Sequence, residues 1–146
     1  MFKAIVEGAR KFKRALSEGS AQLTPAAQEL GDRIGQAFVA GRFADVHAMT
    51  TPSLQQQTGC AQFEASWRDA VRDRGPFTGY EVANVGQIDV GFIPGLEEVP
   101  QSQFVAFLEI AFSSPHVPLD DPKVFAVGVV LLDHGGEIRV GAIHTR

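Results

Sequence analysis

The chain contains 146 residues, of which 45% are hydrophobic and 21% are charged, so it is long and apolar enough to form one globular domain and too apolar to be disordered. Its 13 basic and 17 acidic residues give a net charge of −4, and this acidic balance argues against nucleic-acid binding. The single cysteine, Cys60, excludes an internal disulfide and a zinc site built from several cysteines of one chain.

An amphipathic, basic stretch comes first in the sequence. Residues 1–18, called the basic segment below, carry five basic and two acidic side chains, a charge of +3 within a chain of net −4. Gly19-Ser20 breaks the pattern, so we predict a helical extension over 1–20 and a single domain over 21–146. The apolar side chains of the segment recur at helical spacing: Phe2, Ile5, Val6, Ala9, Phe12 and Leu16.

Helical signals continue as far as Gly75-Pro76, which ends them. Thr24 and Pro25 are favourable residues for the start of a helix, and Gly41 is favourable for its end. Helices are predicted over residues 24–40, 42–49 and 60–74, with a turn or the start of a short helix at 50–53.

After Pro76 the hydrophobic period changes to two residues, which predicts strands over 78–92, 103–113, 123–133 and 137–145. Gly86 and Gly91 are the expected bend sites of the first strand, and Gly135-Gly136 predicts a hairpin. Helices followed by strands indicate an α+β fold with N-terminal helices packed on a curved antiparallel sheet.

The second and third predicted strands are apolar on both sides, as in Val124–Leu132. A sheet with one face in water alternates apolar and polar residues, so both faces of this sheet must be covered. The helices can cover one face. The other requires the basic segment or a second copy of the chain, and we predict a homodimer through the sheet.

The order of these elements resembles the nuclear-transport-factor-2-like superfamily, the cone-shaped, cystatin-like α+β fold. Phe38-Val39-Ala40-Gly41-Arg42-Phe43 is similar to the F-x-x-G-x-F helix turn of such domains. Thr51-Pro52-x-Leu54, Phe63-x-x-x-Trp67 and Gly75-Pro76-Phe77 are similar to an uncharacterised bacterial family within it. The resemblance covers residues 24–146 and leaves out 1–20.

The resemblance implies a pocket between the helices and the sheet, in a module that binds a small apolar ligand or serves a structural, interaction role. Phe38, Phe43, Phe63 and Trp67 are the candidate ligand-binding residues. A core position is the competing interpretation of Trp67, because it lies at helical spacing from Phe63. The alternative function is a lyase, isomerase or cyclase acting on a small apolar substrate, although none of the superfamily's catalytic motifs is matched residue by residue.

Four side chains are the catalytic candidates for that alternative. His47 is a possible general base, and Tyr80 a possible hydrogen-bond donor to a carbonyl. Asp89 and Glu109 are carboxylates within predicted strands, where burial would raise a carboxyl pKa. The competing interpretations are a surface histidine, a sheet-edge tyrosine, and a Glu109 paired across strands with Arg139 or Lys123.

The remaining histidines and Cys60 predict no metal or cofactor site. His116, His134 and His144 are not spaced as a ligand set, and Cys60 at a helix start lacks a neighbouring histidine to activate it. Without a signal-peptide pattern or a long apolar run, a cytoplasmic location is expected. The basic segment suits an anionic membrane surface, but packing against protein is the favoured prediction.

Overall fold

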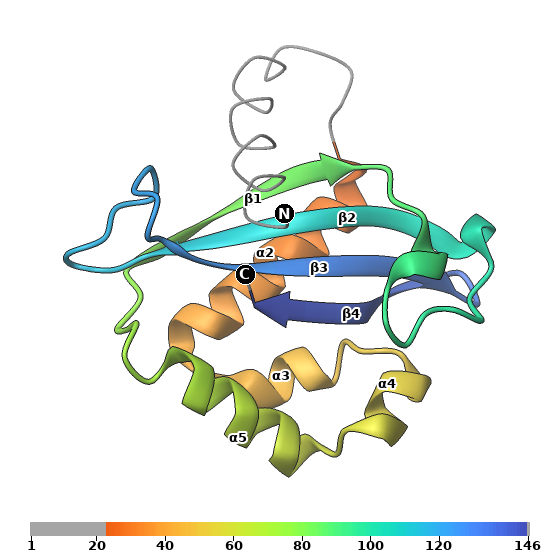
Figure 1. Cartoon of the computed structure of the whole chain (residues 1–146), viewed down its shortest axis with the longest axis horizontal. Coiled ribbons are helices and arrows are strands. Elements are labelled where there is room, and N and C mark those ends of the chain that lie inside the picture. Colours follow the sequence, from red (N-terminus) through yellow and green to blue (C-terminus); the bar gives the residue numbers. More distant parts are fainter. Residues whose placement is uncertain (1–22, 146) are drawn as a thin grey trace.

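In the computed structural model, which describes residues 23–145, four α-helices precede a four-stranded antiparallel sheet (Figure 1). The α+β prediction is therefore confirmed at this level. The helix predicted over 2–18 lies outside the described residues. The helices are α2 (Pro25–Ala40), α3 (Phe43–His47), α4 (Pro52–Gln57) and α5 (Cys60–Val71).

The helix boundaries follow from local chemistry. The Thr24 hydroxyl accepts a hydrogen bond from the Ala27 amide at the start of α2. Pro25 has no N–H group, so it leaves no donor without a partner in this first turn. Gly41 ends α2 in the left-handed conformation (φ 72°), which a residue with a side chain rarely adopts. Thr51 caps α4 in the same way by accepting from the Leu54 amide, so the turn predicted at 50–53 does begin a helix.

The sheet is a meander with strand order β1-β2-β3-β4. Its strands are β1 (Gly79–Gly86), β2 (Phe104–Ser113), β3 (Phe125–His134) and β4 (Glu137–Thr145). Gly135 and Gly136, both with positive φ, form the tight β3–β4 hairpin that the sequence predicted.

The first strand is shorter than predicted. Gly86 has a φ of 116° and lies at an irregularity in the β1–β2 pairing, so the pairing ends there. The predicted strand residues beyond it, 87–92, belong instead to the β1–β2 loop, which contains two short 3₁₀-helices, η1 (Val90–Phe92) and η2 (Gln101–Gln103). Asp89 is therefore not a strand residue; its carboxylate accepts a hydrogen bond from the Gly91 amide and caps η1.

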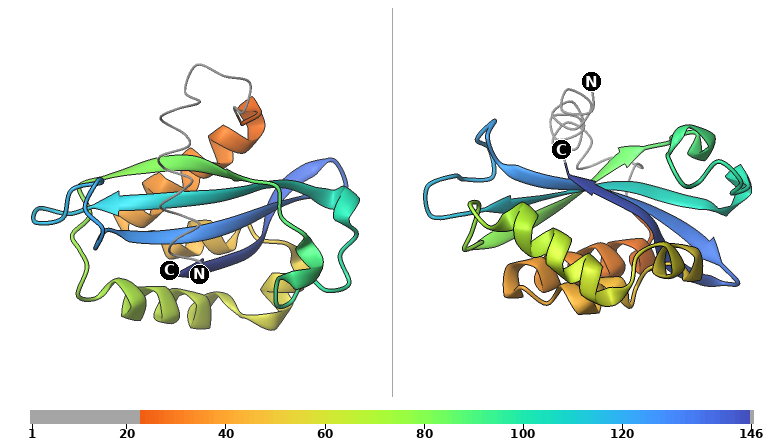
Figure 2. Two further views of the ribbon diagram at one scale, coloured as in Figure 1. Left: turned by 45° about the horizontal axis from the view of Figure 1, so that its top comes forward. Right: turned by 60° about the horizontal axis from the view of Figure 1, so that its bottom comes forward.

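All four described helices lie on one face of the sheet, called the helix face below (Figure 2). Between the two layers lies an aromatic core. Phe38 is at its centre, with its ring 5.1 Å from Phe43 and Trp67 and 5.2 Å from Phe112. The four ligand-binding candidates Phe38, Phe43, Phe63 and Trp67 are all buried, so the aromatic side chains fill the space between helices and sheet.

The opposite side of the sheet, called the second face, is also largely buried. Val90 and Leu96 of the β1–β2 loop pack on Phe107 and Val130 at one end. Val124 packs with Ala111 and Ala126 at the other end. The second face consists of these side chains and their alternating neighbours: Glu81, Ala83, Phe107, Glu109, Ala111, Ala126, Val130, Ala142 and His144.

A bulge in β4 decides which face His144 joins. Val140 pairs with Leu131 and Ala142 with Val130, so Gly141 is an extra residue between them. Val140 packs into the helix-face core, whereas Ala142 belongs to the cluster on the second face. His144 alternates with both residues in the sequence, but because of the bulge it shares the second face with Ala142 alone.

Candidate functional site

A groove with a volume of about 560 Å³ runs between α5 and β4. Its apolar wall comes from Leu54, Phe63, Trp67, Ala70 and Ile143. Four polar residues, Thr58, Ser66, His144 and Thr145, complete the lining. A concave, mainly apolar surface with a few polar groups is the usual form of a small-molecule site.

A smaller hollow of about 170 Å³ adjoins this α5–β4 groove. It lies between α4, the loop containing Pro94 and Val99, and the β3–β4 hairpin, and it shares Leu54, Ile143 and His144 with the groove. Together they follow the edge of β4, which is an outer strand of the sheet.

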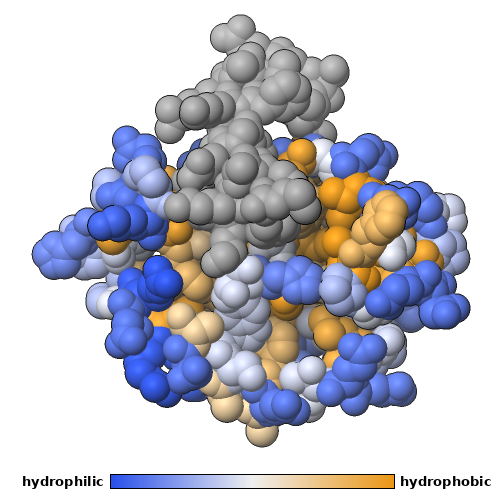
Figure 3. Space-filling model, viewed as in Figure 1, coloured by the Kyte–Doolittle hydropathy of each residue, from blue (hydrophilic) through white to orange (hydrophobic). Residues whose placement is uncertain are grey.

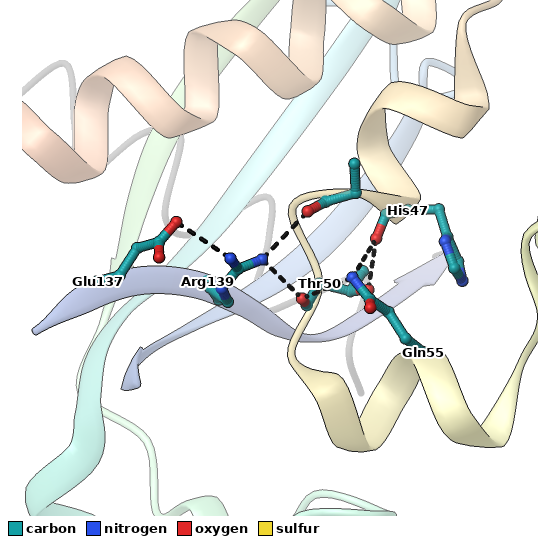
Figure 4. A network of polar contacts seen from close by, with 6 residues as sticks. His47, Thr50, Gln55, Glu137 and Arg139 are labelled. Atoms are coloured by element: carbon teal, nitrogen blue, oxygen red, sulfur yellow. Dashed lines mark hydrogen bonds and ion pairs between the residues drawn. The ribbon is translucent and has the colours of Figure 1, made fainter. Parts of the chain in front are cut away.

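The turn after α3, which leads into the α4 residues that line these hollows, is fixed against β4. Thr50 forms a parallel bridge to Val140, with hydrogen bonds from the Thr51 amide to the Val140 carbonyl and from the Val140 amide to the Met49 carbonyl. Arg139 donates to the carbonyl oxygens of Ala48 (3.1 Å) and Thr50 (3.3 Å), as Figure 4 shows.

Two further side chains hold the same turn. The Thr50 hydroxyl donates to the His47 carbonyl oxygen at 2.6 Å, and the Gln55 amide group donates to the carbonyl oxygens of both residues (Figure 4). Arg139 also pairs with Glu137 at 3.2 Å. The competing expectation that Arg139 pairs with Glu109 is therefore wrong, because its guanidinium reaches the α3–α4 turn instead.

The His47 side chain links two helices. Its Nε2 hydrogen bonds to the Thr58 carbonyl oxygen at 2.8 Å, and its ring meets Phe63 edge-on at 5.2 Å. This places α3 against the start of α5 and supports one wall of the groove. The imidazole is engaged by the backbone, which favours a structural role over that of a general base.

Tyr80 and Asp89 lie away from the groove. The Tyr80 hydroxyl donates to Asp32 at 3.2 Å, and its ring packs over Gly35 of α2. Burial, together with the Asp32 carboxylate, raises the pKa of Tyr80, so the phenol stays protonated at neutral pH. Asp89 is in the β1–β2 loop, where it caps η1.

Glu109 occupies the second face, on the other side of the sheet from His47 and Tyr80. It is 1% exposed and pairs in register with Ala83 and Gly128, and Gly128 pairs in turn with His144. Burial lowers the pKa of His144. The structure therefore does not bring the four catalytic candidates together.

The groove was only partly predictable. Phe63 and Trp67 line it, whereas Phe38 lies behind them in the core. Leu54 and Ile143 were missed, because each is an ordinary apolar residue whose position beside α5 depends on tertiary packing.

Cys60 lies at the first position of α5. Desolvation and the hydrogen-bonded Glu64 carboxylate raise the pKa of its thiol, which disfavours the reactive thiolate. The described residues hold no group of three or more His, Cys, Asp or Glu side chains arranged for a metal ion. Among residues 23–145, no helix has the length and apolarity to cross a bilayer.

Comparisons of the chain with protein-family models, with curated proteins and with solved structures find no significant match.

Proposed function

We propose that this chain is a binding module that holds a small, apolar, planar ligand in the α5–β4 groove. The observation that carries the proposal is the lining of the groove, in which Phe63 and Trp67 offer aromatic surface and Leu54, Ala70 and Ile143 offer aliphatic surface. Its volume of about 560 Å³ is within the range of about 300–1,000 Å³ of sites for drug-sized molecules.

The polar groups of the groove are suited to orient a ligand rather than to transform it. Thr58, Ser66 and Thr145 carry hydroxyls, which donate and accept hydrogen bonds without titrating near neutral pH, and His144, the titratable side chain of the lining, has a pKa that burial lowers. The carboxylates and the phenol proposed as catalysts are on other surfaces, so the alternative of a lyase, isomerase or cyclase has no convergent acid and base among the described residues to support it.

Trp67 is the only tryptophan of the chain, and it provides the signal for a direct test. The neutral fluorophore N-phenyl-1-naphthylamine is the probe, because it is planar and apolar. We expect saturable quenching of Trp67 emission with energy transfer to the probe as its concentration rises.

Two alanines on α5 provide matched variants. Ala70 lines the groove and is partly buried, whereas Ala65 is exposed and does not line it. Ala70→Arg should weaken probe binding at least tenfold, and Ala65→Arg should leave it unchanged. Quenching that does not saturate, or equal binding by both variants, would refute the α5–β4 groove as the ligand site.

A further inference from the structure

On the second face of the sheet, a central strip of mostly small side chains lies between two loops that pack on the ends of the face. Ala83, Glu109, Gly128 and His144 form one row across the four strands, and Ala111 adjoins it. No helix of residues 23–145 lies over this strip, because α2–α5 are all on the helix face (Figures 1 and 2).

The ends of the second face are covered by the two long loops. Val90 and Leu96 of the β1–β2 loop pack at one end, and Val117 and Leu119 of the β2–β3 loop at the other. Figure 3, in the same view as Figure 1, shows hydrophobic surface over the β1–β2 loop beside the sheet. The small alanine side chains and the glycine between these loops let a helix approach the backbone of the sheet closely.

The strip carries acidic side chains as well as apolar ones. Glu109 is buried at its centre, and Glu81 lies on the same face of the edge strand β1, where it pairs with Ala111. His144 is the other titratable group of the row, and burial keeps its pKa low. An occupant with an apolar stripe and basic flanks matches this surface.

We infer that the occupant is the basic segment of the same chain, docked as an amphipathic helix. Its stripe of Phe2, Ile5, Ala9, Phe12 and Leu16 lies on the small-residue strip. A basic side chain at the border of the stripe faces the Glu109 carboxylate. Lys13 is placed for this contact, since it follows Ala9 by four residues, or about one helical turn.

Chain length and connection both allow this arrangement. Eighteen residues of helix span about 27 Å, and a strand of ten residues spans about 33 Å, so the segment fits along the sheet. Figures 1 and 2 show that the first turn of α2 extends past the β1 edge. From Leu23, residues 19–22 reach up to about 14 Å, enough to turn around that edge onto the second face.

A second copy of the chain is the competing occupant, and it corresponds to the predicted homodimer. A two-fold contact centred on the Glu109 row would bring two acidic side chains together in apolar surroundings. Docking of the basic segment, which carries a charge of +3, places basic rather than acidic side chains near Glu109. Charge complementarity therefore favours the segment.

Cross-linking of the intact chain tests the contact directly. A carbodiimide joins a carboxylate to a lysine amine that it touches, and an equal mixture of isotopically light and heavy chains distinguishes links within a chain from links between chains. We expect links from Lys13, at the border of the stripe, to Glu81 or Glu109 within single chains. Mixed-isotope links would overturn the proposal in favour of a second copy, and a complete lack of such links would overturn it outright.

Two aspartate variants test whether the stripe is buried. Ala9 is central to the stripe, whereas Ala4 falls on the opposite side of a helix. We expect Ala9→Asp to lower the melting temperature by at least about 4 °C and Ala4→Asp to change it by less than about 1 °C. Equal melting temperatures would overturn the docking.

Flotation with vesicles of phosphatidylcholine and phosphatidylserine tests the alternative that the basic segment binds an anionic membrane surface. Docking on the sheet leaves the apolar stripe inaccessible, so the intact chain should stay with the unbound fraction. Vesicle binding that Ala9→Asp abolishes, without any change in melting temperature, would assign the segment to a lipid surface and overturn the proposal.

Discussion

Truncation of Trp67 tests whether this side chain is part of the core as well as the wall of the α5–β4 groove. The residue is 7% exposed, and its ring meets Phe38 edge-on at 5.1 Å and Phe63 at 6.3 Å. A buried tryptophan removes roughly 200 Å² from water, worth about 5 kcal/mol at 25 cal/mol per Å². Since one side of the ring borders the groove, we expect Trp67→Ala to cost about 3–5 kcal/mol of the free energy of unfolding.

The measurement is urea unfolding followed by far-ultraviolet circular dichroism, because the variant lacks the tryptophan needed for fluorescence. Ser66→Ala is the control: it also lines the groove, but its exposed hydroxyl contributes little to packing, so its unfolding free energy should stay within about 0.5 kcal/mol of the parent chain. A Trp67→Ala chain that unfolds within about 1 kcal/mol of the parent would show that Trp67 serves the groove alone and that the core does not depend on it.

Three further outcomes are expected. Gly35→Ala places a Cβ 2.4 Å from the Tyr80 ring. Although alanine has the better helix propensity, this clash should destabilise the chain by about 1–3 kcal/mol in chemical unfolding. Adding Tyr80→Ala to the Gly35→Ala chain should remove this penalty. Arg139→Leu should cost about 1–3 kcal/mol in the same assay, because the Ala48 carbonyl loses its side-chain donor and the Thr50 carbonyl keeps only that of Gln55. Glu137→Gln at the exposed end of the pair should cost under about 0.5 kcal/mol. Burial holds the pKa of His144 below its ordinary 6.5, so the imidazole binds a proton more readily in the unfolded chain than in the folded one. Melting temperatures should therefore fall as the pH drops through and below 6.5, and they should fall less steeply in His144→Gln. Parallel curves for the two chains would contradict a buried, neutral His144.

Most of the sheet was predictable because its strands carry strong local signals. The strand predicted over 137–145 coincides with β4, and the one over 103–113 differs from β2 by a single residue. Runs of β-branched and aromatic residues between glycine and proline punctuation leave little choice of structure there. The two-sided apolarity of β2 and β3 also gave a correct expectation that both faces are buried.

The first strand was misjudged for a physical reason. Gln87-Ile88-Asp89-Val90 alternates polar and apolar residues as a strand does, yet in the structure Val90 is buried under the loop and Asp89 caps η1. A loop that packs on a sheet buries alternate residues as well, so a period of two does not distinguish it from a strand. The positive φ of Gly86 is the feature that ends β1, and a glycine alone does not reveal it.

The candidate site was harder to predict than the fold, because its residues are distant in the sequence. Leu54, Trp67 and Ile143 come together only through the packing of α4, α5 and β4. The same limit applies to Glu109 and His144, whose common row depends on the strand register and on the extra residue Gly141 in β4. A one-residue change in that register would move His144 to the helix face.

The two faces of the sheet carry different side chains and suit different occupants. The helix face is filled by aromatic rings, and the α5–β4 groove lies at its β4 edge. The second face has small side chains at its centre, so it is shaped for a covering element rather than for a small ligand, and the buried Glu109 selects a basic one. The proposed ligand site and the proposed docking of the basic segment therefore use opposite sides of one sheet and share only His144 on the edge strand β4, so the loss of either would leave the other testable.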